Sequence, residues 1–163
     1  MRDLLLIADS GPLIALASVQ KLDILPKLYR RVAAPMAVIN EVVASANLRP
    51  GYDLLHQAPW LEQLERSESL DALSIVLGRG ESEAIHVARQ EPTSLLLLDD
   101  AQARRAATAL GLIVTGTAGV LVRAKREGFI ESVRPLLLQM KDHGYYLSNK
   151  VIEYACREAG ELI

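Results

Sequence analysis

The stretch Leu4–Leu13, LLLIADSGPL, places five apolar residues in succession, then Asp9 and Ser10, and then a turn at Gly11 and Pro12. A short apolar run that is bounded by turn residues is typical of a buried strand. An acid at the end of such a strand commonly caps the helix that follows, because its side chain accepts hydrogen bonds from first-turn N–H groups. Asp9 is therefore either a cap or part of a functional site, and the rest of the sequence has to decide.

Apolar runs alternate with segments of helical period along the chain. Further strands are predicted at residues 31–35 (RVAAP), 94–98 (SLLLL) and 112–116 (LIVTG). Helices are predicted at residues 12–20, 21–29 (broken near Pro26), 36–45, 81–90, 101–110 and 118–128. Residues 60–65 (WLEQLE) fit a strand or a helix, and residues 47–59 read as a loop because they hold two prolines and a glycine. Strands separated by helices indicate a mostly parallel sheet covered on both faces.

We therefore predict an α/β fold, a three-layer α/β/α sandwich with a mostly parallel central sheet and extra C-terminal helices. The part of the domain that carries the acids at the strand ends spans about residues 4–127. Two amphipathic segments, at residues 132–144 and 149–160, form a C-terminal helical extension over about residues 130–163. The chain of 163 residues shows no internal repeat and no low-complexity tract, which favours one domain over residues 1–163.

Composition excludes several classes of protein. The single cysteine, Cys156, rules out an internal disulfide and favours a reducing cytoplasm. The apolar run at the N-terminus is too short for a signal-peptide core, and no stretch approaches the roughly 18 apolar residues of a membrane span. The net charge of −2 gives no overall positive field to attract nucleic acid. It does not exclude an enzyme whose acidic pocket holds cations, because bound metal ions reverse the local sign of charge.

Acidic residues follow two of the predicted strands. In an open parallel sheet, ligands bind beyond the carboxyl ends of the strands. Asp9 ends the first strand, whereas Asp99 and Asp100 end the strand at residues 94–98. Glu41 lies in an otherwise apolar helix, and Glu83 lies in the first turn of another. Carboxylates that converge from several elements suit Mg²⁺ or Mn²⁺.

Each acid also has a simpler interpretation. Asp100 fits the N-cap of the next helix as well as it fits a metal ligand. Glu83, beside Glu81, could merely complement the helix dipole, and Glu41 could be an ordinary solvated helix residue. The combination of acids at one sheet edge, rather than any single acid, favours a site.

Five segments in this order resemble the PIN domain family, and specifically VapC-like proteins with a Gly-Glu-Ser-Glu-Ala helix. The segments are IADSGPLIALASVQKLDILPKLY, INEVV, GRGESEAIHVA, LLLLDDAQARRAATALGL and VTGTAGVLVRAKREG. The resemblance extends from about Leu4 to Glu127. Its specificity lies in the ordered set, since DSGPL alone is a weak signal.

The resemblance implies a metal-dependent endoribonuclease that uses Mg²⁺ or Mn²⁺, and that acts as the toxin of a toxin–antitoxin pair. It assigns Asp9, Glu41, Glu83 and Asp99 as catalytic residues and metal ligands, with Asp100 as a further ligand or a cap. Many members carry Thr-x-Asp at the last strand end, whereas this chain has Leu97, Leu98 and two aspartates. Which aspartate faces the metal stays open. Metal ions neutralise a phosphodiester and activate water, so no histidine base is required.

Four residues are weaker candidates for contacts with substrate. Ser10 could hydrogen-bond a ligand carboxylate or simply form a turn, and Arg79 is placed near the rim of the pocket. Thr115 and Thr117, at a helix N-terminus, could hold a phosphate oxygen or cap the helix. Arginines and lysines on later helices, such as Arg104, either follow an RNA backbone or are simply solvated.

The expected partners are an RNA substrate, a separate antitoxin protein and a second copy of the chain, with no membrane. The leucines of the early helices either pair two copies or belong to the core: Leu13, Leu16, Leu22 and Leu25. Two rival functions remain, a DNA nuclease and a PIN-like binding or regulatory module that does not cut. Recognition of a 2′-OH leaves no readable motif in this chain.

Overall fold

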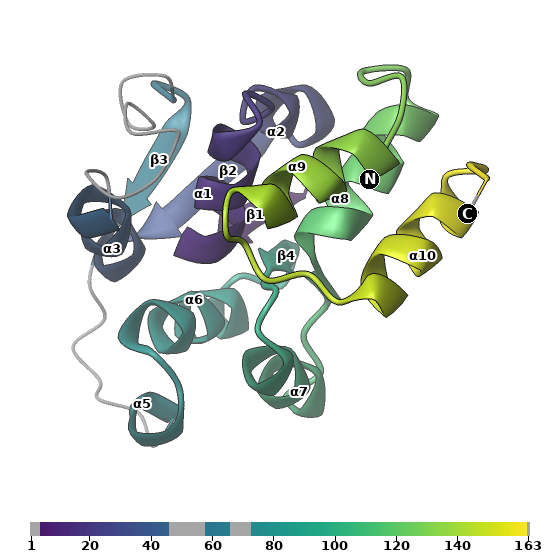
Figure 1. Cartoon of the computed structure of the whole chain (residues 1–163). Coiled ribbons are helices and arrows are strands. Elements are labelled where there is room, and N and C mark those ends of the chain that lie inside the picture. The colour runs from purple at the N-terminus through teal and green to yellow at the C-terminus, as the bar shows by residue number, and fades with distance from the viewer. Residues whose placement is uncertain (1–3, 46–57, 66–72, 163) are drawn as a thin grey trace.

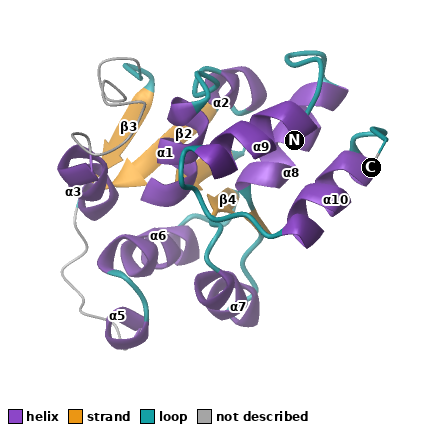
Figure 2. Cartoon of the chain, viewed as in Figure 1, coloured by secondary structure: helices purple, strands orange, loops and turns teal. Residues whose placement is uncertain are grey.

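The central feature of the computed structural model is a sheet of five parallel strands in the order β3-β2-β1-β4-β5. The structure describes residues 4–45, 58–65 and 73–162. The strands are β1 (Leu5–Ala8), β2 (Arg31–Pro35), β3 (Leu61–Leu64), β4 (Ser94–Leu97) and β5 (Val114–Thr115). Figure 2 shows the strands in the interior with helices on both sides. The predicted three-layer α/β/α fold with a parallel sheet is confirmed.

The helices follow the strands in the order that the alternation predicts. They are α1 (Ser10–Ser18), α2 (Ile24–Leu28), α3 (Met36–Ser45), α5 (Leu73–Val76), α6 (Arg79–Gln90), α7 (Ala101–Ala109), α8 (Thr117–Arg126), α9 (Arg134–Asp142) and α10 (Asn149–Glu158). Figure 1 shows α6 and α7 on one side of the sheet and α1, α8, α9 and α10 on the other. Within the described ranges, no helix is both long and apolar enough to cross a membrane.

The two faces of the sheet carry separate hydrophobic cores. Leu6, Ala8 and Leu97 point to one face, where they pack with buried residues of α1, α2, α3, α8, α9 and α10. Leu5, Ile7 and Leu96 point to the other, where they pack with α6 and α7. Successive side chains of a strand alternate between faces, so a strand that is covered on both sides reads as an unbroken apolar run. This explains why β1 and β4 consist almost entirely of leucine, isoleucine and alanine.

The register of β1 and β4 brings their carboxyl ends together. Ala8 pairs with Leu97, and the backbone N–H of Asp9 donates to the carbonyl of Leu97 at 3.1 Å. Leu98 continues the ladder by donating its N–H to Thr115 at 2.9 Å. The acids that follow the two strands are therefore neighbours in space, although they are distant in sequence.

Several details differ from the expectations. Pro26 does not break the helix at residues 24–28 but lies in its first turn, where a missing N–H costs no hydrogen bond. Residues 61–64 form an edge strand, and α5 was not predicted. Most of the loop predicted at residues 47–59 lies outside the described residues. The four early leucines are at most 4% exposed, so they belong to the core and offer no surface for a second copy: Leu13, Leu16, Leu22 and Leu25.

The C-terminal segment returns to the same edge of the sheet. After α9 the chain turns at Gly144, whose φ of +89° lies in the left-handed region that glycine favours. The N–H of Gly144 donates to Lys141, and that of Tyr145 donates to Met140. This turn directs Tyr145 toward the end of β4. Helix α10 then packs against α8 and α9.

Candidate active site

Asp9 has the position of a helix cap but does not act as one. It is the N-cap residue of α1, yet its side chain makes no capping hydrogen bond. The residue is only 6% exposed, and its Oδ1 has no hydrogen-bond partner among the described residues. Buried carboxylate oxygens are normally paired, because leaving one unpaired costs free energy. The capping interpretation of Asp9 therefore fails, and its carboxylate is available to a ligand.

Asp99 lies at the end of the neighbouring strand and is held by three donors. Its Oδ1 accepts from the backbone N–H of Thr117 at 2.8 Å. Its Oδ2 accepts from the hydroxyls of Thr117 and Tyr145. Thr117 begins α8 and is fully buried, whereas Tyr145 comes from the C-terminal segment. Two other elements, α8 and the C-terminal segment, thus fix the orientation of this carboxylate beside Asp9.

Asp100 has a different environment from Asp99. Its Oδ1 accepts from the backbone N–H of Ala103 at 2.8 Å, and it is the N-cap of α7. The side chain is exposed. Of the two adjacent aspartates, Asp100 caps the helix, and Asp99 faces the buried carboxylate of β1.

Glu41 connects α3 to two other elements of the site. Ser10 donates its hydroxyl to Glu41 Oε2 at 2.7 Å, and the backbone N–H of Gly80 donates to Oε1 at 3.0 Å. A Cβ atom on Gly80 would lie 2.7 Å from Glu41 Oε1, so any other residue here would push the carboxylate away from this position. Glu41 is therefore a fixed carboxylate at the junction of α1, α3 and α6 rather than a solvated helix residue.

The N-terminal half of α6 carries two glutamates with different surroundings: Glu81 lies in the first turn, and Glu83, which was predicted there, lies just beyond it. Glu83 lines a pocket of about 580 Å³ together with Glu41 and Arg79. Its Oε1 accepts from Arg79 at 3.4 Å, and its Oε2 is buried without a partner among the described residues. Glu81 accepts from the backbone N–H of Gly78 at 3.0 Å, which caps the helix. Both glutamates therefore belong to the acidic region, but Glu81 is the one whose charge acts on Asp9.

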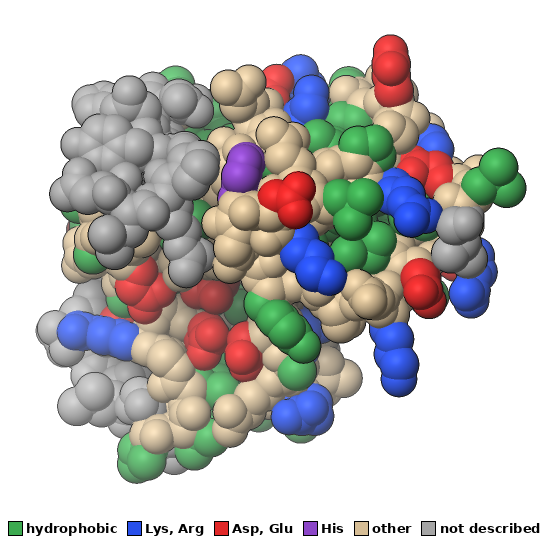
Figure 3. Space-filling model, viewed as in Figure 1, with side chains coloured by type: hydrophobic (Ala, Val, Ile, Leu, Met, Phe, Trp, Pro, Cys, Tyr) green, Lys and Arg blue, Asp and Glu red, His purple; other side chains and the backbone are tan. Residues whose placement is uncertain are grey.

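The electrostatics of the site disfavour the ionised form of Asp9. The pKa of this carboxyl is raised from 3.8 to about 7, mainly by burial and further by the negative charges of Glu81, Glu41 and Asp99, against the opposing effect of a hydrogen bond from the Ser10 backbone. Burial also raises the pKa of Glu81, with Asp100 and Glu41 adding to the shift. Figure 3 shows acidic side chains gathered on this face, with lysine or arginine side chains on both sides of them. Such a cluster is suited to a cation.

The donor atoms of the acidic residues, rather than a preformed coordination geometry, suit this region to a divalent metal ion. Within the described part of the chain, no three acidic, histidine or cysteine side chains form a ready metal-binding group. The available donors are nevertheless carboxylate oxygens, which Mg²⁺ and Mn²⁺ prefer. The unpartnered Oδ1 of Asp9 is the atom that a cation would satisfy, with Asp99 held next to it. The chemistry of these donors therefore fits such an ion.

The weaker candidates lie around these acids. Ser10 contacts Glu41, and Arg79 lies at the pocket that Glu41 and Glu83 share, with its side chain 59% exposed. Thr117 contacts Asp99 instead of opening to solvent. Thr115 lines a second pocket on the other side of Asp99.

Sequence reasoning missed Tyr145, Gly80 and the role of Glu81. No motif marks Tyr145, because it is 46 residues from the aspartate to which it donates. The second glycine of GRGES, Gly80, was a possible signal, since a glycine in the first turn of a helix permits a close approach. Its partner could not have been identified without the packing of α3 against α6.

Comparison with known proteins agrees with this fold. Residues 5–161 match the family model DUF3368, which is described as a PIN domain. A structure of a PilT N-terminus domain protein from the hyperthermophilic archaeon Sulfolobus solfataricus P2 matches with a TM-score of 0.55 and 17% identity, over 74% of this chain and 93% of that one. A domain of a functionally unknown protein from Methanocaldococcus jannaschii matches with a TM-score of 0.46 and 22% identity, over 69% and 89%.

No curated protein sequence matched the chain. The Sulfolobus structure supports the fold alone, whereas the family match extends over nearly the whole sequence. Proteins of the matched family are generally nucleases, which agrees with acids gathered at the carboxyl edge of a parallel sheet. The chain belongs to the PIN domain family.

Proposed function

We propose that the protein is a metal-dependent endoribonuclease that hydrolyses RNA phosphodiester bonds. The observation that carries this proposal is Asp9, a buried carboxylate at a strand end whose side chain makes no capping hydrogen bond and whose Oδ1 has no partner within the described part of the chain. Its neighbours Asp99 and Glu41 are fixed by hydrogen bonds from other elements. A carboxylate placed as Asp9 is serves catalysis better than stability, because burial and the neighbouring negative charges disfavour its ionised form.

The residues of the chain have distinct roles in this proposal. Asp9 and Asp99 would hold Mg²⁺ or Mn²⁺ directly, and Glu41 and Glu83 would complete the ligands or orient bound water. The ion would neutralise the phosphodiester and make water a stronger nucleophile. Thr117 and Tyr145 hold Asp99, and Ser10 and Gly80 hold Glu41, so that the carboxylates keep their orientation when substrate arrives. Asp100 caps α7 and is not needed as a ligand.

The test is cleavage of a mixed single-stranded RNA pool with Mn²⁺, with Mg²⁺ and with EDTA. Asp9→Asn and Asp99→Asn should abolish cutting, whereas Asp142→Asn should not, because Asp142 is an exposed acid at the end of α9. A matched single-stranded DNA pool in parallel tests the DNA nuclease alternative. Wild-type protein that binds RNA without cutting it in either metal would favour the binding or regulatory module and refute the enzyme.

The finer proposal is a VapC-like toxin that acts in the cytoplasm, is held by a separate antitoxin and forms a homodimer. The motif order supports the VapC-like branch, and the single cysteine supports the compartment. The pocket beside Glu41 and Glu83 supports an antitoxin that places an arginine there, because its walls combine acids with the apolar side chains of Met36, Ala37 and Ala44. The buried early leucines mean that a dimer must use another surface.

Growth after induced expression tests the toxin role. Wild-type protein should arrest growth, and Asp9→Asn should not. Growth arrest by both proteins, or by neither, would contradict a toxin that acts through this site. Light scattering on the purified protein tests the dimer.

A further inference from the structure

A second pocket lies on the other side of Asp99, away from Glu41. It has a volume of about 400 Å³ and is formed where α7, α8 and α10 meet. Its walls are formed by residues at the end of β4, in α7, in β5 and the start of α8, and in α10: Asp99, Arg104, Val114, Thr115, Gly116, Ala118, Gly119, Lys150, Val151 and Tyr154. We call it the α10 pocket. Of the residues that line this pocket, the proposed nuclease mechanism uses only Asp99.

Arg104 is held in a fixed position at the inner end of the α10 pocket. Its Nη1 donates to the carbonyl of Leu98 at 2.7 Å. A Cβ atom on Gly116 would lie 2.7 Å from Asp99 Oδ1 and 3.0 Å from Arg104 Nη1, so the glycine allows the acid and the guanidinium to approach the same point. A guanidinium has five N–H donors, and the bond to Leu98 uses one of them. The remaining donors suit a phosphate directly beside the candidate catalytic acid.

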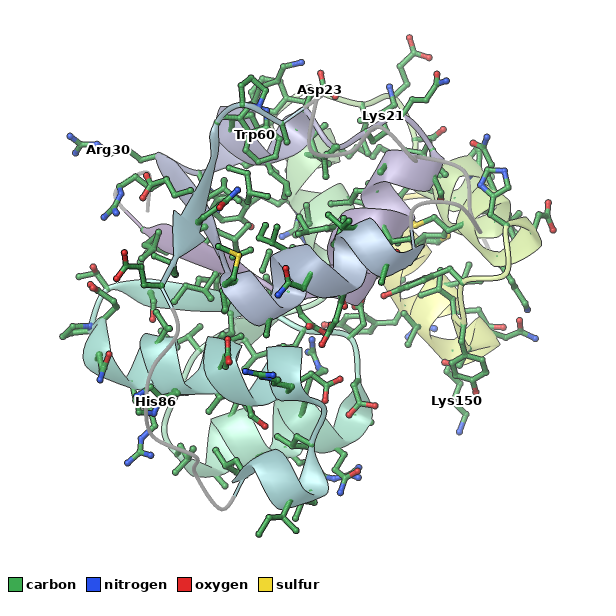
Figure 4. The ribbon with its side chains drawn as sticks, turned by 90° about the vertical axis from the view of Figure 1, so that its left-hand side faces the viewer. Lys21, Asp23, Arg30, Trp60, His86 and Lys150 are labelled. Carbon is green, nitrogen blue, oxygen red and sulfur yellow. The ribbon has the colours of Figure 1, made fainter. Side chains whose placement is uncertain are left out.

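Helix α10 supplies the outer wall of the pocket. Its inward face consists of Ile152, Ala155 and Cys156, which are buried. The pocket side carries Lys150, Val151 and Tyr154, and Tyr154 is 63% exposed. Figure 4 shows Lys150 extending away from the body of the protein. The exposed ring does not serve the core, and an exposed aromatic beside a cation is a typical surface for stacking a nucleobase.

We propose that the α10 pocket binds the nucleotide adjacent to the cleaved phosphodiester in a single-stranded nucleic acid. The base stacks on Tyr154, and its phosphate meets Arg104 and Lys150. This inference rests on the proposed nuclease function, because it places the substrate across Asp99. The acids repel a phosphate, so cations next to them give the strand a place to bind before it reaches the site. Stacking needs an unpaired base, which favours a single strand over a duplex.

The test measures binding without cleavage. A short fluorescein-labelled single-stranded RNA is titrated with protein in EDTA, and fluorescence anisotropy gives the affinity at several salt concentrations. Tyr154→Ala should weaken binding about fivefold or more, with the salt dependence unchanged, because it removes stacking. Arg104→Gln should weaken binding and reduce the slope of log K against log salt by about 0.7, which corresponds to one phosphate contact on a single strand.

Two matched controls separate the pocket from the general surface. Arg105→Gln removes the same charge from the same helix, at an exposed position outside the pocket. Tyr146→Ala removes a tyrosine that is 88% exposed and does not line the pocket. Both should leave the affinity within about twofold of wild type. Lys150→Gln serves as the second cation variant if Arg104→Gln fails to fold, which circular dichroism detects.

The outcomes separate this inference from the proposed function. Wild-type protein that never cleaves, but loses RNA affinity on Tyr154→Ala and not on Tyr146→Ala, would support the pocket and refute the nuclease. Wild-type protein that cleaves, with Tyr154→Ala binding as tightly as wild type, would overturn the pocket. Equal losses from Arg104→Gln and Arg105→Gln, or equal affinity for the same RNA annealed into a duplex, would also overturn it. Failure of the wild type to bind RNA in EDTA would overturn the pocket, whereas the nuclease would still be decided by cleavage with Mn²⁺ or Mg²⁺.

Discussion

Asp9→Asn should stabilise the protein, and the gain should grow with pH. The pKa of Asp9 is raised from 3.8 to about 7, mainly by burial. Between these two values the native state keeps a proton that the unfolded chain has released, so the free energy of unfolding falls as the pH rises through this range and levels off above it. A shift of roughly three units corresponds to about 4 kcal/mol of destabilisation at high pH, at about 1.36 kcal/mol per unit. Asparagine has the same shape and does not ionise, so this cost disappears.

Urea unfolding in EDTA at about pH 5 and about pH 8 measures this effect, because the linkage places most of the change between those values. The stability gain of Asp9→Asn over wild type should be about 2 to 3 kcal/mol larger at the higher pH. Asp142→Asn is the matched control, since this exposed carboxyl on α9 should give the same stability difference at both pH values. Added Mn²⁺ should reduce the advantage of Asp9→Asn, because a cation bound at the acids stabilises only the native wild type.

A stability gain that is equal at both pH values would refute the reasoning. It would mean that Asp9 ionises in the folded protein as easily as in the unfolded chain, and that its buried Oδ1 is satisfied in solution. A loss of stability on Asp9→Asn would be a stronger contradiction. It would show that the charged carboxylate supports the fold, and it would remove the main argument for a site.

The remaining predictions concern the residues around Asp9. Tyr145→Phe removes one hydrogen-bond donor to the Asp99 carboxylate and should lower the free energy of unfolding in guanidinium by about 1.5 to 3 kcal/mol. It should also slow cleavage at saturating RNA. Unchanged stability and an unchanged cleavage rate would contradict the hydrogen bond. Asp100→Ala removes a cap and should cost about 1 kcal/mol by thermal unfolding while metal-dependent cleavage persists; loss of cleavage in folded protein would make Asp100 a ligand. Gly80→Ala places a methyl group against Glu41 and should lower the free energy of unfolding by about 1 to 3 kcal/mol. Its Mn²⁺ affinity, measured by calorimetry, should also be weaker. A variant that binds Mn²⁺ as tightly as the wild type would exclude Glu41 from the site.

Most of the sheet was predictable because its strands are buried on both faces. β1 and β4 read as continuous apolar runs, and their order among helices indicates a parallel sheet. β3 was not decided from sequence, since an edge strand has intermediate burial and its residues 61–64 fit two periods. Pro26 was wrongly expected to break its helix, because its position relative to the helix start decides the effect of a proline.

The acids of the site could be named from sequence, but their separate roles could not. The position of Asp9 after β1 predicts either a cap or a ligand, and only its missing capping bond distinguishes the two. The sequence alone does not distinguish the adjacent Asp99 and Asp100. Their side chains point in different directions, because Asp100 accepts a hydrogen bond from α7 whereas Asp99 accepts one from Thr117. Tyr145 is beyond any local pattern, since the turn at Gly144 and the packing of α9 bring it to the site.

The way in which the acids are held bears on how the site works. Asp99 and Glu41 have their oxygens engaged by donors from other elements, so they are oriented before any ligand arrives. Asp9 has no such support at Oδ1, and burial together with the neighbouring charges raises its pKa. A bound cation would stabilise the ionised form of Asp9. We therefore expect Asp9 to contribute most to the free energy of cation binding at this cluster. It follows that replacing Asp9 should weaken metal binding more than replacing either of the carboxylates that the protein itself already satisfies.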